Sequence, residues 1–219
     1  MLKYGKYFSA AAIGLAIYVI AMLIFKIPID PIMGSIVAGA IVLIMSSSDL
    51  RKIRSQFQEM RSQVAEYIAD KDAKKFIENH SNFIDNANDE AVKNMAMLNL
   101  GGAYADIGEF DKAREIIEEI DMKAFGKKNL NNATVNIIIL KYRIGDWDEG
   151  DADYDRAFND KLPSGILYEI VDVLRHRNNE DSLRRLSDMN LKEENKAYGN
   201  LISTAKMLLA KGIDQDVRI

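Results

Sequence analysis

The chain has 219 residues, a formal net charge of −4 and no cysteine. Without cysteine it forms no disulfide or thiolate metal site, and no segment has the clustered positive charge typical of nucleic-acid-binding proteins. The most hydrophobic residues precede Asp49, and almost all the charged residues follow it. This asymmetry predicts a membrane anchor at residues 1–48 and a soluble domain at residues 49–219.

Two uncharged apolar runs lie near the start of the chain, at residues 8–25 and 31–48. The first is long enough to cross a bilayer as a helix, and the second, whose strongly apolar part is confined to Ile32–Met45, is on the short side. Pro28 and Pro31 break the helix between them, so we expect a transmembrane hairpin that contacts lipid through residues 8–48. A signal peptide fits less well, because no small-x-small cleavage site follows Phe25. Small residues along both runs would allow close packing of the pair, or equally a homo-oligomer.

The cations that flank the hairpin predict its orientation. The link between the two runs contains only Lys26, whereas the flanks carry Lys3, Lys6, Arg51, Lys52, Arg54 and Arg61. The positive-inside rule therefore places both termini, and the soluble domain, in the cytoplasm of a two-span membrane protein. The cations after the second run either contact anionic headgroups or only stop transfer.

The segment after the second run predicts a helix that continues from the membrane, with apolar residues on one face up to Ile68. A turn is expected at residues 70–72, followed by a second amphipathic helix from Ala73 to Ile84.

The clearest pattern along the chain lies between Met97 and Ile120, where apolar spacing predicts two short helices separated by a turn at Gly108. Gly101 is small, as close approach of a neighbouring helix would require. This segment resembles the tetratricopeptide repeat, a helix–turn–helix unit of 34 residues, although the proline near the end of that repeat is missing. The matching positions are Leu100, Gly101, Tyr104, Gly108, Phe110 and Ala113.

The remaining chain predicts more helices. Residues 126–132 read as a polar connector and residues 133–144 as a strongly apolar helix that ends at Gly145. Asp146 is a suitable N-cap for the next helix, in which Gly150 takes the place of Ala113. After a break at residues 163–165, helices are expected over residues 166–177, 182–189 and 193–211.

The predicted breaks are almost evenly spaced. They fall at Lys71, Gly108, Gly145, Asn178 and Gly212, with separations of 37, 37, 33 and 34 residues. Even spacing indicates a stacked array, because one helix pair cannot bury its apolar face alone. We therefore expect an all-α fold, with a tetratricopeptide-like α-solenoid of about three and a half repeats over residues 57–212.

No catalytic motif is present, and we expect neither enzymatic activity nor a cofactor. His80 follows a helical face among polar neighbours and is expected at the surface, and His176 is expected at a helix end. Asp151, Asp153 and Asp155 alternate as in a calcium loop. Arg156 and Leu162 stand where that loop needs glycine and glutamate, so no metal site is expected.

The resemblance implies a concave groove, lined by the first helix of each repeat, that binds a peptide or protein. The function expected from it is a membrane-anchored, non-enzymatic adaptor. The alternative is an accessory or regulatory subunit of a membrane enzyme or transporter that contacts its complex through the hairpin. The groove residues expected by position are Met95, Leu98, Asn132, Asn136, Ile139, Arg143, Tyr168, Asp172 and Arg175.

Overall fold

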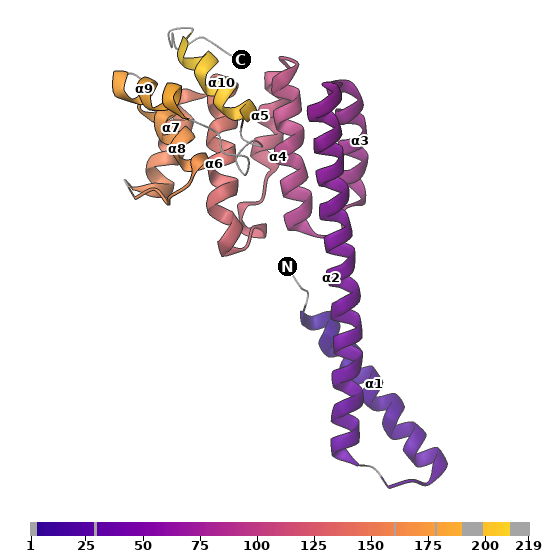
Figure 1. Cartoon of the computed structure of the whole chain (residues 1–219). Coiled ribbons are helices and arrows are strands. Elements are labelled where there is room, and N and C mark those ends of the chain that lie inside the picture. The colour runs from indigo at the N-terminus through magenta and orange to yellow at the C-terminus, as the bar shows by residue number, and fades with distance from the viewer. Residues whose placement is uncertain (1–3, 29, 160, 178, 190–198, 211–219) are drawn as a thin grey trace. The chain divides into compact units, whose positions relative to one another are not determined.

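The computed structural model describes residues 4–28, 30–159, 161–177, 179–189 and 199–210 (Figure 1). Within these ranges the chain forms helices and no strand, which confirms the all-helical prediction. The chain divides into two compact units, Met1–Ser62 and Gln63–Ile219. The boundary falls inside one long helix, α2, which spans Pro31–Asp70.

The first unit is a helical hairpin of α1, Tyr4–Phe25, and the first part of α2. Both helices are long and apolar enough to cross a membrane. Many of their large apolar side chains point outward, for example Phe8 at 78% and Leu43 at 68% exposure. Large exposed apolar patches are rare on water-soluble proteins and mark surfaces that contact another protein or a membrane.

Two glycines allow α1 and the first part of α2 to pack closely. A Cβ atom on Gly14 would lie 2.0 Å from Cδ1 of Ile41, and one on Gly34 would lie 3.3 Å from the Tyr18 ring. The pairs Gly14–Ile41 and Tyr18–Gly34 run in opposite directions along the two helices, so the hairpin is antiparallel. These contacts agree with the close packing expected from the small residues of both runs.

Polar contacts close both ends of the hairpin. The Tyr18 hydroxyl donates to the Asp30 carbonyl at 3.0 Å. At the other end, the Asp49 carboxylate accepts from the Lys6 ammonium at 2.6 Å and from the Tyr7 hydroxyl at 2.7 Å. Asp49 therefore lies inside α2 and binds α1, and the helix runs on through it without a break.

The second unit contains the last residues of α2 and a series of shorter helices, coloured in chain order from purple to yellow in Figure 1. Helix α4 packs against α3, α5 and α6, and α6 packs in turn against α7 and α8. Helices α8, α9 and α10 contact one another. The helices are α3 Ala73–Asn86, α4 Glu90–Asp106, α5 Phe110–Glu119, the short 3-10 helix η1 Met122–Ala124, α6 Lys127–Arg143, α7 Trp147–Phe158, α8 Ile166–Arg175, α9 Glu180–Asp188 and α10 Gly199–Ala210.

Three turns of this unit share one backbone conformation at the positions predicted from the sequence. Lys71, Gly108 and Gly145 have φ of 59°, 80° and 88° and stand 37 residues apart. A positive φ costs glycine little and an L side chain more, which explains two of the three residue types. The fourth and fifth predicted breaks, Asn178 and Gly212, lie outside the described residues.

Helix α6 forms the centre of the core because it is apolar on more than one side. Ile137 and Leu140 pack into a cluster with α4 and α5, whereas Ile138 and Tyr142 pack into a second cluster with α7 and α8. A helix that is apolar around its circumference is buried on several faces. Gly101 of α4 lets α6 approach, because a Cβ atom there would lie 2.9 Å from Cδ2 of Leu140.

Some sequence predictions for this unit were wrong. Residues 127–132 belong to α6, because no proline or other breaker separates them from the apolar part of the helix. Helix α8 ends at Arg175, and α9 begins earlier than predicted, at Glu180. The predicted start of the last helix, residues 193–198, lies outside the described residues, which resume with α10.

His80 is fully buried instead of lying at the surface. Its ring stacks between Phe76 and Phe83, with centroid distances of 4.3 and 5.8 Å. Nδ1 lies 2.7 Å from the Gln63 side-chain oxygen, on the facing turn of α2. The polar neighbours of His80 in sequence gave no indication of this tertiary contact.

Candidate functional site

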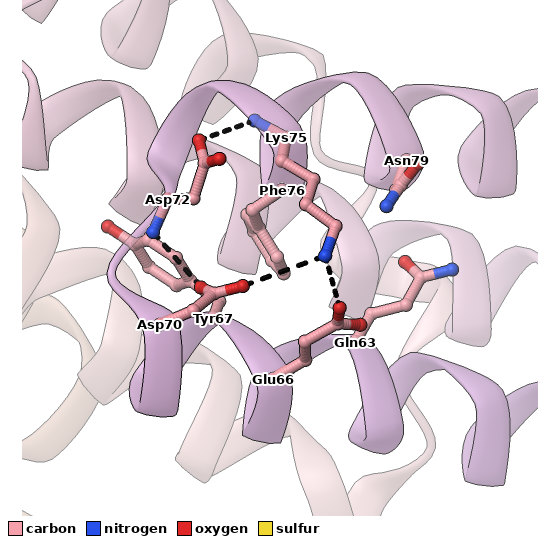
Figure 2. Close-up of a pocket in the computed structure, with 8 residues that line it drawn as sticks. All are labelled: Gln63, Glu66, Tyr67, Asp70, Asp72, Lys75, Phe76 and Asn79. Carbon is pink, nitrogen blue, oxygen red and sulfur yellow. Dashed lines mark hydrogen bonds and ion pairs between the residues drawn. The ribbon is translucent and has the colours of Figure 1, made fainter.

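Two of the hollows in the described part of the second unit are lined by α2 and the helices next to it, and the smaller one lies at the turn between α2 and α3. Figure 2 shows the Lys75 ammonium between the carboxylates of Glu66 and Asp70. The Lys75 amide also donates to Asp72 at 3.0 Å, which caps α3. The hollow has a volume of about 10 Å³, room for about one water molecule and no larger ligand.

The larger hollow is an open groove of about 220 Å³ between α2, α3, α4 and α6. All four helices contribute side chains within the second unit. The apolar lining includes Val64, Ile68, Phe76, Met95, Leu98 and Ile139. The polar lining consists of Tyr67, Asn99, Asp106, Asn136 and Arg143.

The repeat of 37 residues places matching polar side chains in the groove. Asn99 and Asn136 are separated by this interval on α4 and α6, and so are Asp106 and Arg143. Because α4 packs against α6, equivalent positions of the two helices face the same hollow. Spacings of three and four residues along each helix keep Met95, the two asparagines and the charged pair on that face.

One end of the groove is closed by a charged network. The Arg143 guanidinium binds the Asp106 carboxylate, which also accepts the Tyr67 hydroxyl. Arg143 Nη1 donates weakly to the Gly102 carbonyl at 3.5 Å. Burial and the bond to Asp106 raise the pKa of Tyr67 above its ordinary value, so the phenol stays protonated. Because the arginine and the carboxylate neutralise each other, this end carries no net charge.

The middle of the groove presents amide groups. The Asn136 Nδ2 donates to the Asn132 carbonyl at 2.9 Å, one turn earlier on α6, and the side-chain oxygen of Asn136 has no hydrogen-bond partner among the described residues. Within the described part of the chain, the side chain of Asn99 makes no hydrogen bond. A carboxamide carries both donor and acceptor, so these two side chains can pair with peptide groups of a bound chain.

The structure brings five of the nine expected groove residues into this hollow: Met95, Leu98, Asn136, Ile139 and Arg143. The other four contact neighbouring helices. The Asn132 side chain accepts from the Tyr168 hydroxyl at 2.7 Å. Asp172 accepts from Tyr154 at 3.0 Å and from Arg185 at 2.9 Å, and Arg175 pairs with Asp155 at 3.2 Å.

Sequence reasoning missed three polar groove residues: Tyr67, Asn99 and Asp106. Tyr67 comes from the end of α2, a helix that was not expected to line the groove. Asn99 and Asp106 could have been predicted from the sequence, because they lie one interval between turns, 37 residues, before Asn136 and Arg143. Both of those residues were expected in the groove.

The acidic run of α7 is paired with cations of its own unit. Asp151 accepts from the Tyr142 hydroxyl at 2.8 Å and from Arg177 at 3.1 Å, and Lys141 lies 2.9 Å from Asp153. No group of three potential metal ligands occurs in the described ranges. These carboxylates therefore stabilise contacts between α6, α7 and α8.

Comparison of the chain with protein-family models, with curated proteins and with solved structures gives no match. Among the described residues, two surfaces bear on function: the groove of the second unit and the outward-facing apolar side chains of the hairpin.

Proposed function

We propose that the protein is a membrane-anchored, non-enzymatic adaptor that holds a peptide segment of a partner protein in the groove of its helical unit. The observation that carries the proposal is the groove itself, in which side chains from four helices surround about 220 Å³. Tetratricopeptide-like stacking of about three and a half helix pairs is part of the proposal. The equal spacing of the turns at Lys71, Gly108 and Gly145 supports it.

The size and chemistry of the groove favour a peptide over a small molecule. Pockets for drug-sized ligands usually enclose about 300–1,000 Å³, more than this groove offers. Leu98 and Ile139 provide an apolar floor for one or two side chains, while Asn99 and Asn136 offer amides to a peptide backbone. The carboxylate of Asp106 is held by Arg143 and Tyr67, so it is poorly placed to act as a general base.

The anchoring part of the proposal rests on the hairpin. Two apolar helices with outward-facing side chains at residues 8–25 and 31–48 would cross the bilayer, with both termini in the cytoplasm. Because the chain has no cysteine, single cysteines can report the topology. Ile27→Cys in the link should react with an impermeant thiol reagent in intact cells, and Lys127→Cys only after permeabilisation. The reverse pattern would exclude this orientation.

The groove is tested by capture of partner proteins on the tagged full chain in mild detergent. Replacing both Asn99 and Asn136 by alanine removes two amide contacts, and we expect captured partner to fall by about tenfold. Asn82 and Asn131 are exposed asparagines outside the groove, and the same double change there should leave capture unchanged. Equal capture by both double variants would contradict the proposal.

Asn99 and Asn136 are better positions than Arg143 for testing the groove by mutation. A glutamate at residue 143 would face the Asp106 carboxylate, and two adjacent carboxylates repel each other. Loss of capture in that variant would therefore report instability as well as a lost contact.

A second candidate function is an accessory subunit that contacts a membrane enzyme or transporter through the hairpin. Ser35 and Gly39 lie on an exposed part of α2, and nothing lies within 4 Å of a Cβ atom built on Gly39. Such an open surface admits another helix. In the full chain, Gly39→Leu should then abolish capture while the groove variant retains it, the opposite of the adaptor result.

A further inference from the structure

We propose that the protein binds anionic phospholipid headgroups through a cationic collar on α2, formed by Arg51, Lys52 and Arg54. The inference rests on the proposed insertion of the hairpin into the bilayer. It goes beyond anchoring, because an apolar hairpin by itself does not discriminate between lipid headgroups.

The collar directly follows the apolar surface of the hairpin. Ile44 and Leu50 are 67% and 54% exposed, and Arg51 is the next residue. A helix rises 1.5 Å per residue, so the three cations lie within about 4.5 Å along the axis. A headgroup layer is about 5–8 Å thick on each side of the hydrocarbon core, so all three cations reach the same layer.

The charges of the collar are not neutralised by nearby acids. Between Pro31 and Gln58 the sole acidic residue of α2 is Asp49, and its carboxylate is occupied by Lys6 at 2.6 Å and Tyr7 at 2.7 Å. Lys52 attracts Asp49 only at longer range. No described carboxylate forms an ion pair with any collar residue, and all three side chains are exposed.

The directions of the collar side chains suit a lipid surface. At 100° per residue, Arg51 and Arg54 point about 60° apart, and Lys52 points about 100° away from Arg51. The collar therefore meets headgroups on more than one side of the helix. Arg51 Nε donates to the Ser47 carbonyl at 3.3 Å, which leaves its terminal nitrogens for a phosphate.

Arg61 provides a matched control on the same helix. It is exposed like the collar residues and makes no ion pair with a described acid. It lies about 10 Å beyond Arg54 along the axis. That distance exceeds the Debye length of about 8 Å at physiological salt, so its attraction to the headgroups is weak.

The test uses the full chain in micelles with equal amounts of phosphatidylglycerol and phosphatidylcholine, and native mass spectrometry counts the lipids that remain bound. We expect the wild type to retain mainly phosphatidylglycerol. Each change of Arg51, Lys52 or Arg54 to glutamine should lower that preference about fivefold, and Arg61→Gln should leave it within about twofold. A wild type without preference, or a loss with Arg61→Gln equal to that of the collar variants, would overturn the proposal.

Alkaline carbonate extraction of cell membranes separates this inference from the anchoring on which it depends. Wild type and collar variants should both stay in the membrane fraction, because the apolar hairpin is unchanged. Retention without any lipid preference would refute the collar alone. Release of the wild type into the soluble fraction would refute the anchor and the collar together.

Discussion

Arg114 of α5 binds Asp146 at the start of α7 through two hydrogen bonds, with Nε–Oδ2 at 2.9 Å and Nη2–Oδ1 at 2.7 Å. Asp146 occupies the N-cap of α7, but its side chain makes no capping bond to that helix. The carboxylate instead joins two successive helix pairs. Hydrogen bonding to Asp146 raises the pKa of Arg114 further above its ordinary value, so the guanidinium keeps its charge in this contact.

Breaking this pair should destabilise the second unit. Asp146 is 17% exposed and Arg114 33%, so the bond lies between a surface pair and a buried one. We expect Arg114→Ala to lower the free energy of unfolding by about 1–2 kcal/mol. Urea denaturation of the full chain in detergent can measure this through Trp147, the single tryptophan, which is 3% exposed and stacked on Tyr142.

The control for this prediction is a surface ion pair of the same type. Arg156 binds Asp153 three residues away and is 77% exposed, so Arg156→Ala should cost less than about 0.5 kcal/mol. A double-mutant cycle with Asp146→Asn then measures the coupling of the Arg114 pair directly. A coupling energy near zero would show that the bidentate contact contributes nothing to stability.

Gly150 should be intolerant of even one added methyl group. A Cβ atom there would lie 2.5 Å from Cε1 of the buried Tyr142 ring. In the preceding helix pair, Ala113 corresponds to Gly150 and Ala105 corresponds to Tyr142. The larger side chain of Tyr142 is therefore accommodated by the smaller residue at position 150. We expect Gly150→Ala to cost about 1–3 kcal/mol in urea denaturation.

The double variant Tyr142→Ala/Gly150→Ala tests this explanation, because it restores the alanine pair of the earlier repeat. In the Tyr142→Ala background, the Gly150 change should cost less than about 0.5 kcal/mol, since alanine also favours helix. Gly126→Ala is the control, because its φ is −64° and a Cβ atom on it would have no neighbour within 4 Å. An equal cost in both backgrounds would disprove the steric account.

Lys71→Gly should stabilise the protein, which is unusual for a glycine substitution. Lys71 has a φ of 59°, a conformation in which an L residue is strained. The equivalent residues of the next two turns, Gly108 and Gly145, are both glycines. The strain of about 1–3 kcal/mol outweighs the conformational entropy of glycine, leaving a gain of about 0.5–1 kcal/mol. Lys74→Gly, within α3, should instead cost about 1 kcal/mol. A loss of stability with both changes would contradict the prediction.

His80 should make the second unit sensitive to acid. Burial lowers the pKa of His80 to about 4, below its value of about 6.5 in an unfolded chain. The unfolded state therefore binds the proton first, and stability decreases as the pH falls below about 6.5 towards 4. Between pH 7 and pH 4.5 we expect this one residue to contribute a loss of about 2–3 kcal/mol.

Comparison of variants isolates this contribution from that of the carboxylates. His80→Phe keeps an aromatic ring between Phe76 and Phe83, and it should remove the loss from the pH dependence of urea denaturation. His176→Asn changes an exposed histidine and should retain it. If His80→Phe and the wild type lost the same stability on acidification, the buried imidazole would not be the sensitive group.

The sequence predicted those parts of the fold that depend on local chemistry. The turns at Gly108 and Gly145 were found because a positive φ selects glycine, and the two helices around Gly108 because apolar residues recur at helical spacing. His80 was misplaced because its burial depends on Gln63 and on aromatic residues that only the tertiary fold brings together.

The groove was predictable to the extent that it follows the repeat. Asn136 and Arg143 were found by counting from a turn, and the structure places both in the hollow. The same count on α8 gave Asp172 and Arg175, which instead bind cations and acids of adjacent helices. Counting gives a position along a helix, but it does not give the partner available to the side chain.

The close contact at Gly101 makes the packing between two successive helix pairs specific. Leu140 of the next pair fills the space that a side chain on Gly101 would occupy, whereas residue 138, the equivalent of Gly101 on α6, is the buried isoleucine Ile138. The junction on one side of α6 therefore differs in shape from the junction on its other side. The helix pairs of this chain are therefore not interchangeable modules. A chimera has to keep both packing surfaces of each junction, the one on the earlier helix pair and the one on the later pair.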